Sequence, residues 1–189
     1  GYNDVGWHGS EIATPFLDSL VAKGVELSNY YGHMICTPSR SALMSGRYAF
    51  HAGMQHSYWY PGQSGGLPLK FPTLADHLKA EGYSTHMVGK WHLGYESRAF
   101  TPLGRGFDSY YGIPYSNDMD RIASAPKYRE SLFKPKAKYF NVPLMRDTKI
   151  IERPAEQTTI SRRFTEETLK FIRANKAKPF FVYLAHSMP

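Results

Sequence analysis

The single cysteine of this chain stands in a short stretch whose residue types and spacing could do chemistry. Cys36 begins the run Cys-Thr-Pro-Ser-Arg. Pro38 suits the first turn of a helix, so Thr37 is predicted to cap a helix over 38–44 with Cys36 at its mouth. Free N–H groups and the positive end of the helix dipole favour an anion there. Arg40 lies about one turn further along, where its planar guanidinium can reach the same spot and bind an oxyanion.

Two other interpretations of the cysteine compete with this one. A lone cysteine is usually a small buried apolar side chain, but its place before a helix start and an arginine makes that interpretation less attractive. A phosphatase thiolate needs a run of backbone N–H donors between the cysteine and the arginine. Only three residues lie between Cys36 and Arg40, and one of them, Pro38, has no N–H to donate. With one cysteine, an intrachain disulfide and a zinc site of several cysteines are both excluded.

A second group of candidate residues follows a strand-like segment. Lys90 and His92 come after Gly89 and the strand predicted over 83–88, where side chains point into a strand-end crevice. Their spacing of two places both on one face if the strand continues. Ser116 stands in a later loop. The alternatives are a solvated lysine, a structural histidine and a loop serine without a role.

Alternating helix and strand patterns must position these residues, which predicts an α/β fold with functional groups in loops at strand ends. Proline at the start, glycine at the end and 3.6-residue periodicity predict the helices, and short apolar runs predict the strands. The first predicted helix opens at residues 14–15 and stops at Gly24, and the second covers 38–44. The third opens at residues 71–73 and stops at Gly82, and the fourth covers 158–174. The predicted strands cover 25–27, 83–88 and 179–185, the last as a continuous buried strand of a parallel sheet. Residues 118–156 are predicted to form an irregular excursion.

Composition limits the classes of partner. The net charge of +7 suggests anionic partners, but the 23 basic residues are scattered, which argues against nucleic-acid binding. No apolar run approaches the ~20 residues of a membrane span. The first residues have no signal-peptide pattern, and we expect residues 1–189 to be part of a single domain truncated at both ends.

Two motifs carry a family resemblance. Residues 36–47, Cys-Thr-Pro-Ser-Arg-Ser-Ala-Leu-Met-Ser-Gly-Arg, resemble the modification site of the type I sulfatases, whose cysteine is oxidised to formylglycine. Residues 82–92, Gly-Tyr-Ser-Thr-His-Met-Val-Gly-Lys-Trp-His, resemble the second sulfatase motif. Residues 1 to about 112, including Asn-Asp-Val-Gly at 3–6 and Arg-Gly-Phe-Asp at 105–108, are most similar to the arylsulfatase B group. The later part is more similar to the arylsulfatase A and galactosamine-6-sulfatase groups.

The resemblance implies an alkaline-phosphatase-like fold, with a mixed, mostly parallel sheet flanked by helices, and a sulfuric ester hydrolase. One hydroxyl of the hydrated aldehyde at position 36 attacks sulfur, and the other lets the covalent intermediate collapse and expel sulfate. It assigns Arg40 to holding the formylglycine, Lys90 to contacting sulfate, and His92 to a hydrogen bond with the diol. It assigns Ser116 to a sulfate contact. The substrate would be an aryl or carbohydrate sulfate ester.

The resemblance also implies a divalent cation, calcium with magnesium as the alternative, that binds Cys36 as formylglycine. Its other ligands would lie before Gly1 or after Pro189, so the fragment alone is expected to be inactive. A formylglycine-generating enzyme would be a partner during maturation. The implied location is the secretory route, with a lysosomal, extracellular or periplasmic destination.

Two other functions remain open at the level of sequence. One is a phosphoester or phosphonate hydrolase of the same superfamily, because a tetrahedral oxyanion site does not sharply separate sulfate from phosphate. The other is an inactive relative that binds sulfated glycans, against which the retained Cys36 and Arg40 argue.

Overall fold

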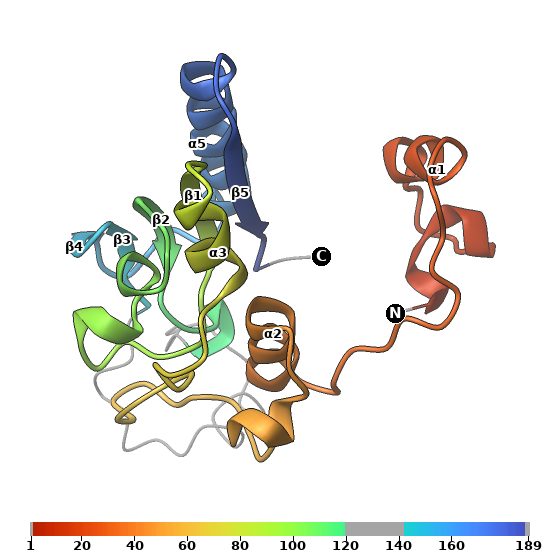
Figure 1. Cartoon of the computed structure of the whole chain (residues 1–189). Coiled ribbons are helices and arrows are strands. Elements are labelled where there is room, and N and C mark those ends of the chain that lie inside the picture. The colour runs from red at the N-terminus through yellow and green to blue at the C-terminus, as the bar shows by residue number, and fades with distance from the viewer. Residues whose placement is uncertain (1, 120–141, 188–189) are drawn as a thin grey trace. The chain divides into compact units, whose positions relative to one another are not determined.

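A computed structural model describes residues 2–119 and 142–187, and the chain divides into two compact units, Gly1–Gly32 and His33–Pro189. The α-helices are α1 (Pro15–Val21), α2 (Cys36–Ser45), α3 (Leu74–Ala80) and α5 (Ile160–Asn175). The strands are β1 (Ser84–Lys90), β2 (Ser109–Ile113), β3 (Leu144–Arg146), β4 (Lys149–Glu152) and β5 (Phe180–Ala185). Short 3-10 turns connect several of these elements. Helix α1 belongs to the first unit and all other named elements to the second (Figure 1).

The first unit is small and held by a few polar contacts. The Thr14 hydroxyl accepts a hydrogen bond from the Gly6 amide (2.8 Å) and donates to the Asp18 carboxylate (2.7 Å). The strand predicted over 25–27 is wrong, because these residues form no strand and Val25 is 88% exposed. A three-residue apolar run becomes a strand only when a partner takes its backbone hydrogen bonds, and no described residue of this unit does so.

The second unit contains a five-stranded mixed sheet in the order β4-β3-β2-β1-β5. Strand β1 runs parallel to β2 on one side and to β5 on the other, whereas β3 and β4 are antiparallel additions beyond β2. The predicted α/β class with a mixed sheet flanked by helices is confirmed. The strands predicted over 83–88 and 179–185 are both present and pair with each other, since Thr85 lies opposite Phe181 and His86 opposite Val182.

Part of the predicted irregular excursion over 118–156 is regular. Residues 144–152 form the β3–β4 hairpin, and its first strand pairs with β2 through Tyr111 and Arg146. Asp147 turns this hairpin with a φ of 55°. Strands of three and four residues lack a recognisable alternation of their own, so their pairing depends on the edge that β2 offers. Residues 120–141 of the predicted excursion lie outside the described residues.

Successive residues of β1 point to opposite faces of the sheet, and each face has its own apolar core. Met87 packs into a cluster that includes Met44 of α2 and Ala75 of α3. Val88 packs into a second cluster with Phe164 of α5. Helices from distant parts of the chain therefore cover both faces of the sheet, and α2 is held against the face that contains Met87.

Strand β5 is not buried on both faces, so the prediction of a fully buried strand is wrong for this structure. It pairs only with β1 and forms one edge of the described sheet. Leu184 is 38% exposed, and the residues from Phe180 to Tyr183 are half-buried. Its continuous apolar sequence indicates full burial, but burial also needs neighbours on both sides.

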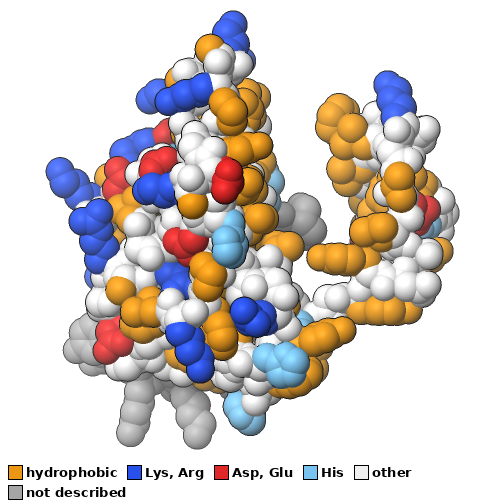
Figure 2. Space-filling view, in the orientation of Figure 1, with side chains coloured by type: hydrophobic (Ala, Val, Ile, Leu, Met, Phe, Trp, Pro, Cys, Tyr) orange, Lys and Arg blue, Asp and Glu red, His pale blue; other side chains and the backbone are white. Residues whose placement is uncertain are grey.

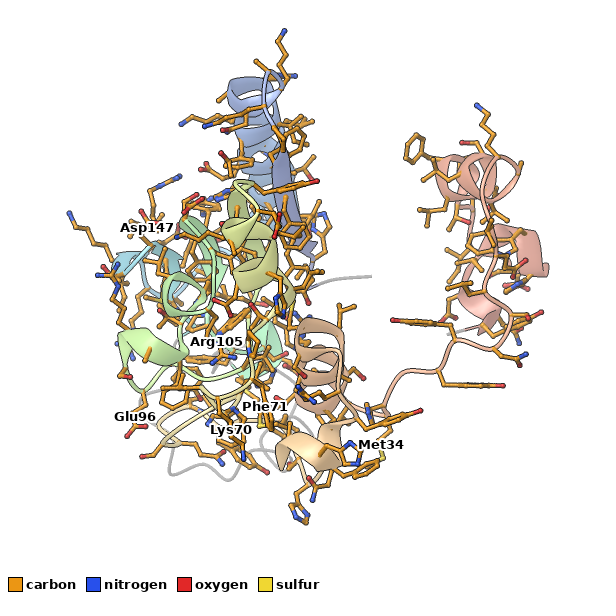
Figure 3. All side chains as sticks on the ribbon, in the orientation of Figure 1. Met34, Lys70, Phe71, Glu96, Arg105 and Asp147 are labelled. Carbon is orange, nitrogen blue, oxygen red and sulfur yellow. The ribbon has the colours of Figure 1, made fainter. Side chains whose placement is uncertain are left out.

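The Arg-Gly-Phe-Asp segment at 105–108 is a structural clamp beside α3. Arg105 is 3% exposed and donates to the carbonyl of half-buried Phe71 at 2.5 Å. Figure 3 labels both residues. Gly106 has φ +86°, and a Cβ there would lie 2.1 Å from the Asp76 nitrogen. Only glycine allows this approach, so the motif stabilises the scaffold instead of the site.

Surface features give two findings about partners. On the visible face, Lys and Arg side chains are interspersed with acidic and apolar groups and form no continuous basic surface (Figure 2). Among the described residues, no helix has both the length and the apolar character needed to cross a membrane.

Candidate active site

Helix α2 places Cys36 at its first position. The helix begins before the predicted residue 38, with Ile35 as its N-cap, and ends at Gly46, whose φ of 63° is the left-handed cap conformation. The prediction that Thr37 caps the helix is therefore wrong. Thr37 is fully buried, and its hydroxyl donates to the His92 carbonyl (3.0 Å) and accepts from the Trp59 amide (3.1 Å). It connects the start of α2 to the segment after β1.

Arg40 extends from the first turns of α2 toward the end of β1. Its Nη1 donates to the Lys90 carbonyl and, at 3.4 Å, to the Tyr183 hydroxyl of β5. Cys36, Arg40 and Tyr183 line one hollow of about 340 Å³ at the surface. Its other lining residues are His33, Met34, Ile35, Ser39 and Leu43.

Lys90 is the last residue of β1 and points into the same region. It is 8% exposed, and its ammonium donates to the Ser116 hydroxyl at 2.9 Å. Burial lowers the pKa of Lys90, while the neighbouring Cys36 acts in the opposite direction through its charge and a hydrogen bond. The Lys90 ammonium is thus largely removed from water, so its electrostatic effect on the neighbouring Cys36 is weakly screened.

His92 is fully buried and adopts a φ of 61°, an uncommon conformation for a residue with a side chain. The strand ends at Lys90, so the condition under which both side chains would share one face of a continuing strand is not met. The Trp59 carbonyl can only accept a hydrogen bond, so His92 Nε2 is the protonated nitrogen of the 2.9 Å contact.

The other imidazole nitrogen, Nδ1, is buried without a hydrogen-bond partner among the described residues. Burial, followed by the charge of Lys90, lowers the pKa of His92 to about 3. His92 is therefore neutral at ordinary pH, and Nδ1 carries a lone pair that can accept a proton or a hydrogen bond.

The sequence-predicted residues lie around the start of α2 and the carboxyl end of β1. Arg40 contacts the backbone of Lys90, and Lys90 interacts with both Cys36 and Ser116. His92 is connected to the same helix through Thr37, as described above. Their chemical roles remain predictions.

Sequence reasoning missed three residues of this region. Tyr183 is 143 positions from Arg40, so no local signal relates them. Asp118 contributes its charge to the electrostatics of both Lys90 and His92, and the only local signal for it is its place two residues after Ser116. Burial raises the pKa of Tyr58 to about 12, with smaller contributions from Tyr60, Asp118 and Cys36.

An aromatic loop borders the region. Residues 53–63 form a hollow of about 540 Å³, and Tyr58 and Tyr60 stack obliquely with ring centroids 4.8 Å apart. The loop is attached to the site by the two backbone contacts of Trp59, to Thr37 and to His92. Its position therefore depends on the same residues that position the histidine.

The residues present suit a modified cysteine better than a metal ion. Lys90 interacts with Cys36, and Arg40 lines the same hollow as Cys36, so two cations could bind an oxygen group added to that side chain. Within residues 2–119 and 142–187, no group of three or more His, Cys, Asp and Glu side chains could hold a metal ion. A cation-binding site would need further ligands in addition to Cys36.

The described part of the chain is thus an α/β fold in which Cys36 and Arg40 line a hollow at the start of a helix, beside the end of β1. A family model described as Sulfatase matches residues 1–189. The chain belongs to the sulfatase family, whose members use formylglycine and a divalent cation.

Individual sulfatases are similar to this chain in sequence and in structure. Mouse arylsulfatase J is 56% identical over 112 residues, which is 59% of this chain and 19% of that protein. Mouse arylsulfatase G is 34% identical over 206 aligned positions, covering 98% of this chain and 39% of that protein. The crystal structure of Ps i-CgsB is 34% identical, with a TM-score of 0.81 over all of this chain and 43% of that chain. A second structure of it is described as a complex with k-i-k-neocarrahexaose. This chain thus spans about two fifths of the length of arylsulfatase G and Ps i-CgsB.

Proposed function

We propose that the intact protein hydrolyses sulfate esters to an alcohol and inorganic sulfate, with Cys36 converted to formylglycine. The observation that carries this proposal is the unpaired Nδ1 of neutral His92, close to the basic groups around Cys36. Buried polar atoms are usually hydrogen-bonded. His86 Nε2 is also buried without a partner among the described residues, but of these two histidines only His92 is acted on by the charges of Lys90 and Arg40. The unpaired Nδ1 is an available acceptor among the basic groups Lys90 and Arg40.

Each side chain has a role that its contacts permit. The hydrated aldehyde would supply the nucleophilic hydroxyl. His92 Nδ1 accepts a hydrogen bond from that group and orients it, because Nε2 is already held by Trp59. The Lys90 ammonium binds a sulfate oxygen and stabilises negative charge as it develops, and Ser116 orients that ammonium and contacts sulfate. Arg40, bound to the Lys90 carbonyl, holds the modified side chain.

The cation proposed for the intact enzyme is calcium, with magnesium as the alternative, and modified Cys36 would be one of its ligands. Hard cations of this type take oxygen ligands, which suits a hydrated aldehyde. The remaining ligands are proposed to lie outside this chain. Maturation would require a formylglycine-generating enzyme, and we propose the secretory route with a lysosomal, extracellular or periplasmic destination.

The substrate is proposed to be an aryl or carbohydrate sulfate ester. The aromatic loop 53–63 offers a hollow beside the site in which a sugar or aryl ring can stack on Tyr58, Trp59 or Tyr60. The complex of Ps i-CgsB with the oligosaccharide k-i-k-neocarrahexaose supports a carbohydrate substrate by analogy.

Mass spectrometry and turnover together test the proposed function. In active intact protein, the tryptic peptide Gly24–Arg40 should carry formylglycine at position 36, and Cys36→Ala should abolish sulfate release without loss of the fold. Unmodified cysteine throughout an active preparation would contradict the mechanism. Loss of stability in Cys36→Ala, with unchanged activity per folded molecule, would instead show a structural cysteine.

Two assays separate the other functions. Faster turnover of 4-nitrophenyl phosphate than of 4-nitrophenyl sulfate would favour a phosphoester hydrolase. Binding of a sulfated oligosaccharide without turnover, by protein that carries formylglycine and metal, would favour an inactive glycan-binding relative.

A further inference from the structure

The guanidinium of Arg40 is held by acceptors from two neighbouring strands. One is the Lys90 carbonyl at the end of β1, and the other is the Tyr183 hydroxyl of β5, 3.4 Å from Nη1. The parallel pairing of Met87 with Tyr183 fixes the register of these strands. Because both strands run in the same direction, Tyr183 is brought beside the hollow that contains Cys36.

Tyr183 is suited to act as a neutral acceptor. Its ring lies nearly parallel to that of Phe107, with centroids 6.5 Å apart, so the apolar core restrains it. Burial raises the pKa of Tyr183, and the charge of Arg40 opposes this. The phenol therefore stays protonated and accepts from Arg40 through an oxygen lone pair.

We propose that Tyr183 is a positioning residue for Arg40, a role that rests on the proposed sulfatase function. Two acceptors on one guanidinium nitrogen restrain its plane. The other N–H groups of Arg40, which donate to none of the described residues, can then hold the modified side chain of Cys36. Without the Tyr183 hydroxyl, Arg40 keeps one anchor and can rotate about it, so the nucleophile is held less well.

The matched test compares two tyrosine hydroxyls that each accept from an arginine. Tyr183→Phe removes the hydroxyl that contacts Arg40 and keeps the ring. The control is Tyr111→Phe, which removes a hydroxyl that accepts from Arg163 Nε at 3.2 Å in the core on the other face of the sheet. In the intact, formylglycine-containing enzyme, Tyr183→Phe should lower kcat by about 3- to 10-fold with little change in KM. Tyr111→Phe should leave kcat unchanged.

A double-mutant cycle separates positioning from general packing. In an Arg40→Lys background, Tyr183→Phe should have no further effect on kcat, because the lysine ammonium has lost the planar contact that the hydroxyl restrains. The melting temperature of Tyr183→Phe should match that of Tyr111→Phe within about 2 °C.

Three results would overturn the proposal. The first is an unchanged kcat in Tyr183→Phe. The second is an equal factor of decrease in kcat when Tyr183→Phe is made in the wild-type and in the Arg40→Lys background. The third is a loss of activity that parallels a loss of stability. Each leaves the proposed function intact if the wild-type enzyme releases sulfate. A wild-type enzyme that carries formylglycine and metal but releases no sulfate would overturn the proposed function, and this role with it.

Discussion

Replacing Lys90 by methionine removes a buried positive charge and keeps most of the side-chain volume. The Lys90 ammonium is almost completely removed from water and is held by the Ser116 hydroxyl. Its interaction with charge on sulfate is therefore weakly screened. Removing a comparable electrostatic donor lowers kcat by ~10²- to 10³-fold, or about 2.7–4 kcal/mol of transition-state stabilisation. We expect Lys90→Met to lower kcat by at least ~10²-fold.

The effect on stability should have the opposite sign. The pKa of Lys90 is lower in the folded protein than in the unfolded chain, because burial disfavours the charged form. The charge therefore costs folding free energy below the folded-state pKa, and this cost disappears as the pH rises above it. At neutral pH, the free energy of unfolding of Lys90→Met should be unchanged or higher.

Steady-state kinetics with 4-nitrophenyl sulfate and urea unfolding measure both quantities on the intact enzyme. Lys79→Met is the control, because Lys79 is exposed and its 2.7 Å ion pair with Asp108 lies at the surface, where such pairs contribute 0 to about 1 kcal/mol. A Lys90→Met enzyme with unchanged kcat and only a raised KM would show that Lys90 merely attracts the anion. Parallel losses of stability and activity would show a packing role.

Three further predictions concern the histidine, the aromatic loop and the clamp. His92→Ala should lower kcat and make the free energy of unfolding less sensitive to acid. Wild-type His92 stays neutral down to a pKa of about 3, whereas the imidazole of the unfolded chain takes up a proton below about 6.5, so the wild-type free energy of unfolding falls by up to ~1.4 kcal/mol per pH unit between these values. Urea unfolding at several pH values measures the difference between the two proteins. Equal pH slopes for the two proteins would show that His92 is charged in the fold. Trp59→Ala should raise KM for an oligosaccharide sulfate and hardly alter it for 4-nitrophenyl sulfate; equal effects on both would argue against a sugar subsite. Gly106→Ala should destabilise the fold by at least ~2 kcal/mol more than Gly82→Ala. Both glycines have φ near +85°, but of the two only Gly106 would place a Cβ against backbone atoms. Equal melting temperatures of the two variants would contradict this prediction.

Local signals in the sequence predicted the elements that carry the site. Proline near the start and Gly46 at the end bound α2 within two residues, and the apolar run before Lys90 marks β1. The α/β class follows from the alternation of such segments. Both motifs are continuous in sequence, so their residues can be found without knowledge of the fold.

Features that depend on distant partners were missed or predicted wrongly. The run at 25–27 has strand-like residues but no strand partner among residues 2–32, and the hairpin over 144–152 becomes regular because β2 offers it an edge. Thr37 has the residue type of a cap, but it bonds to the backbone of Trp59 and His92 instead. Tyr183 could not be related to Arg40 by spacing, because only the pairing of β5 with β1 brings them together.

The long separation between Arg40 and Tyr183 has a consequence for the time available during protein synthesis. Tyr183 of β5, which lines the hollow beside Cys36, is added to the chain 143 residues after Arg40. At 5–20 residues per second, this takes roughly 7–30 s. The proposed oxidation of Cys36 would be easiest within that interval, because the cysteine is more accessible before β5 is synthesised and pairs with β1 than afterwards. Slow translation of the segment between α2 and β5 should therefore increase the fraction of molecules that mature.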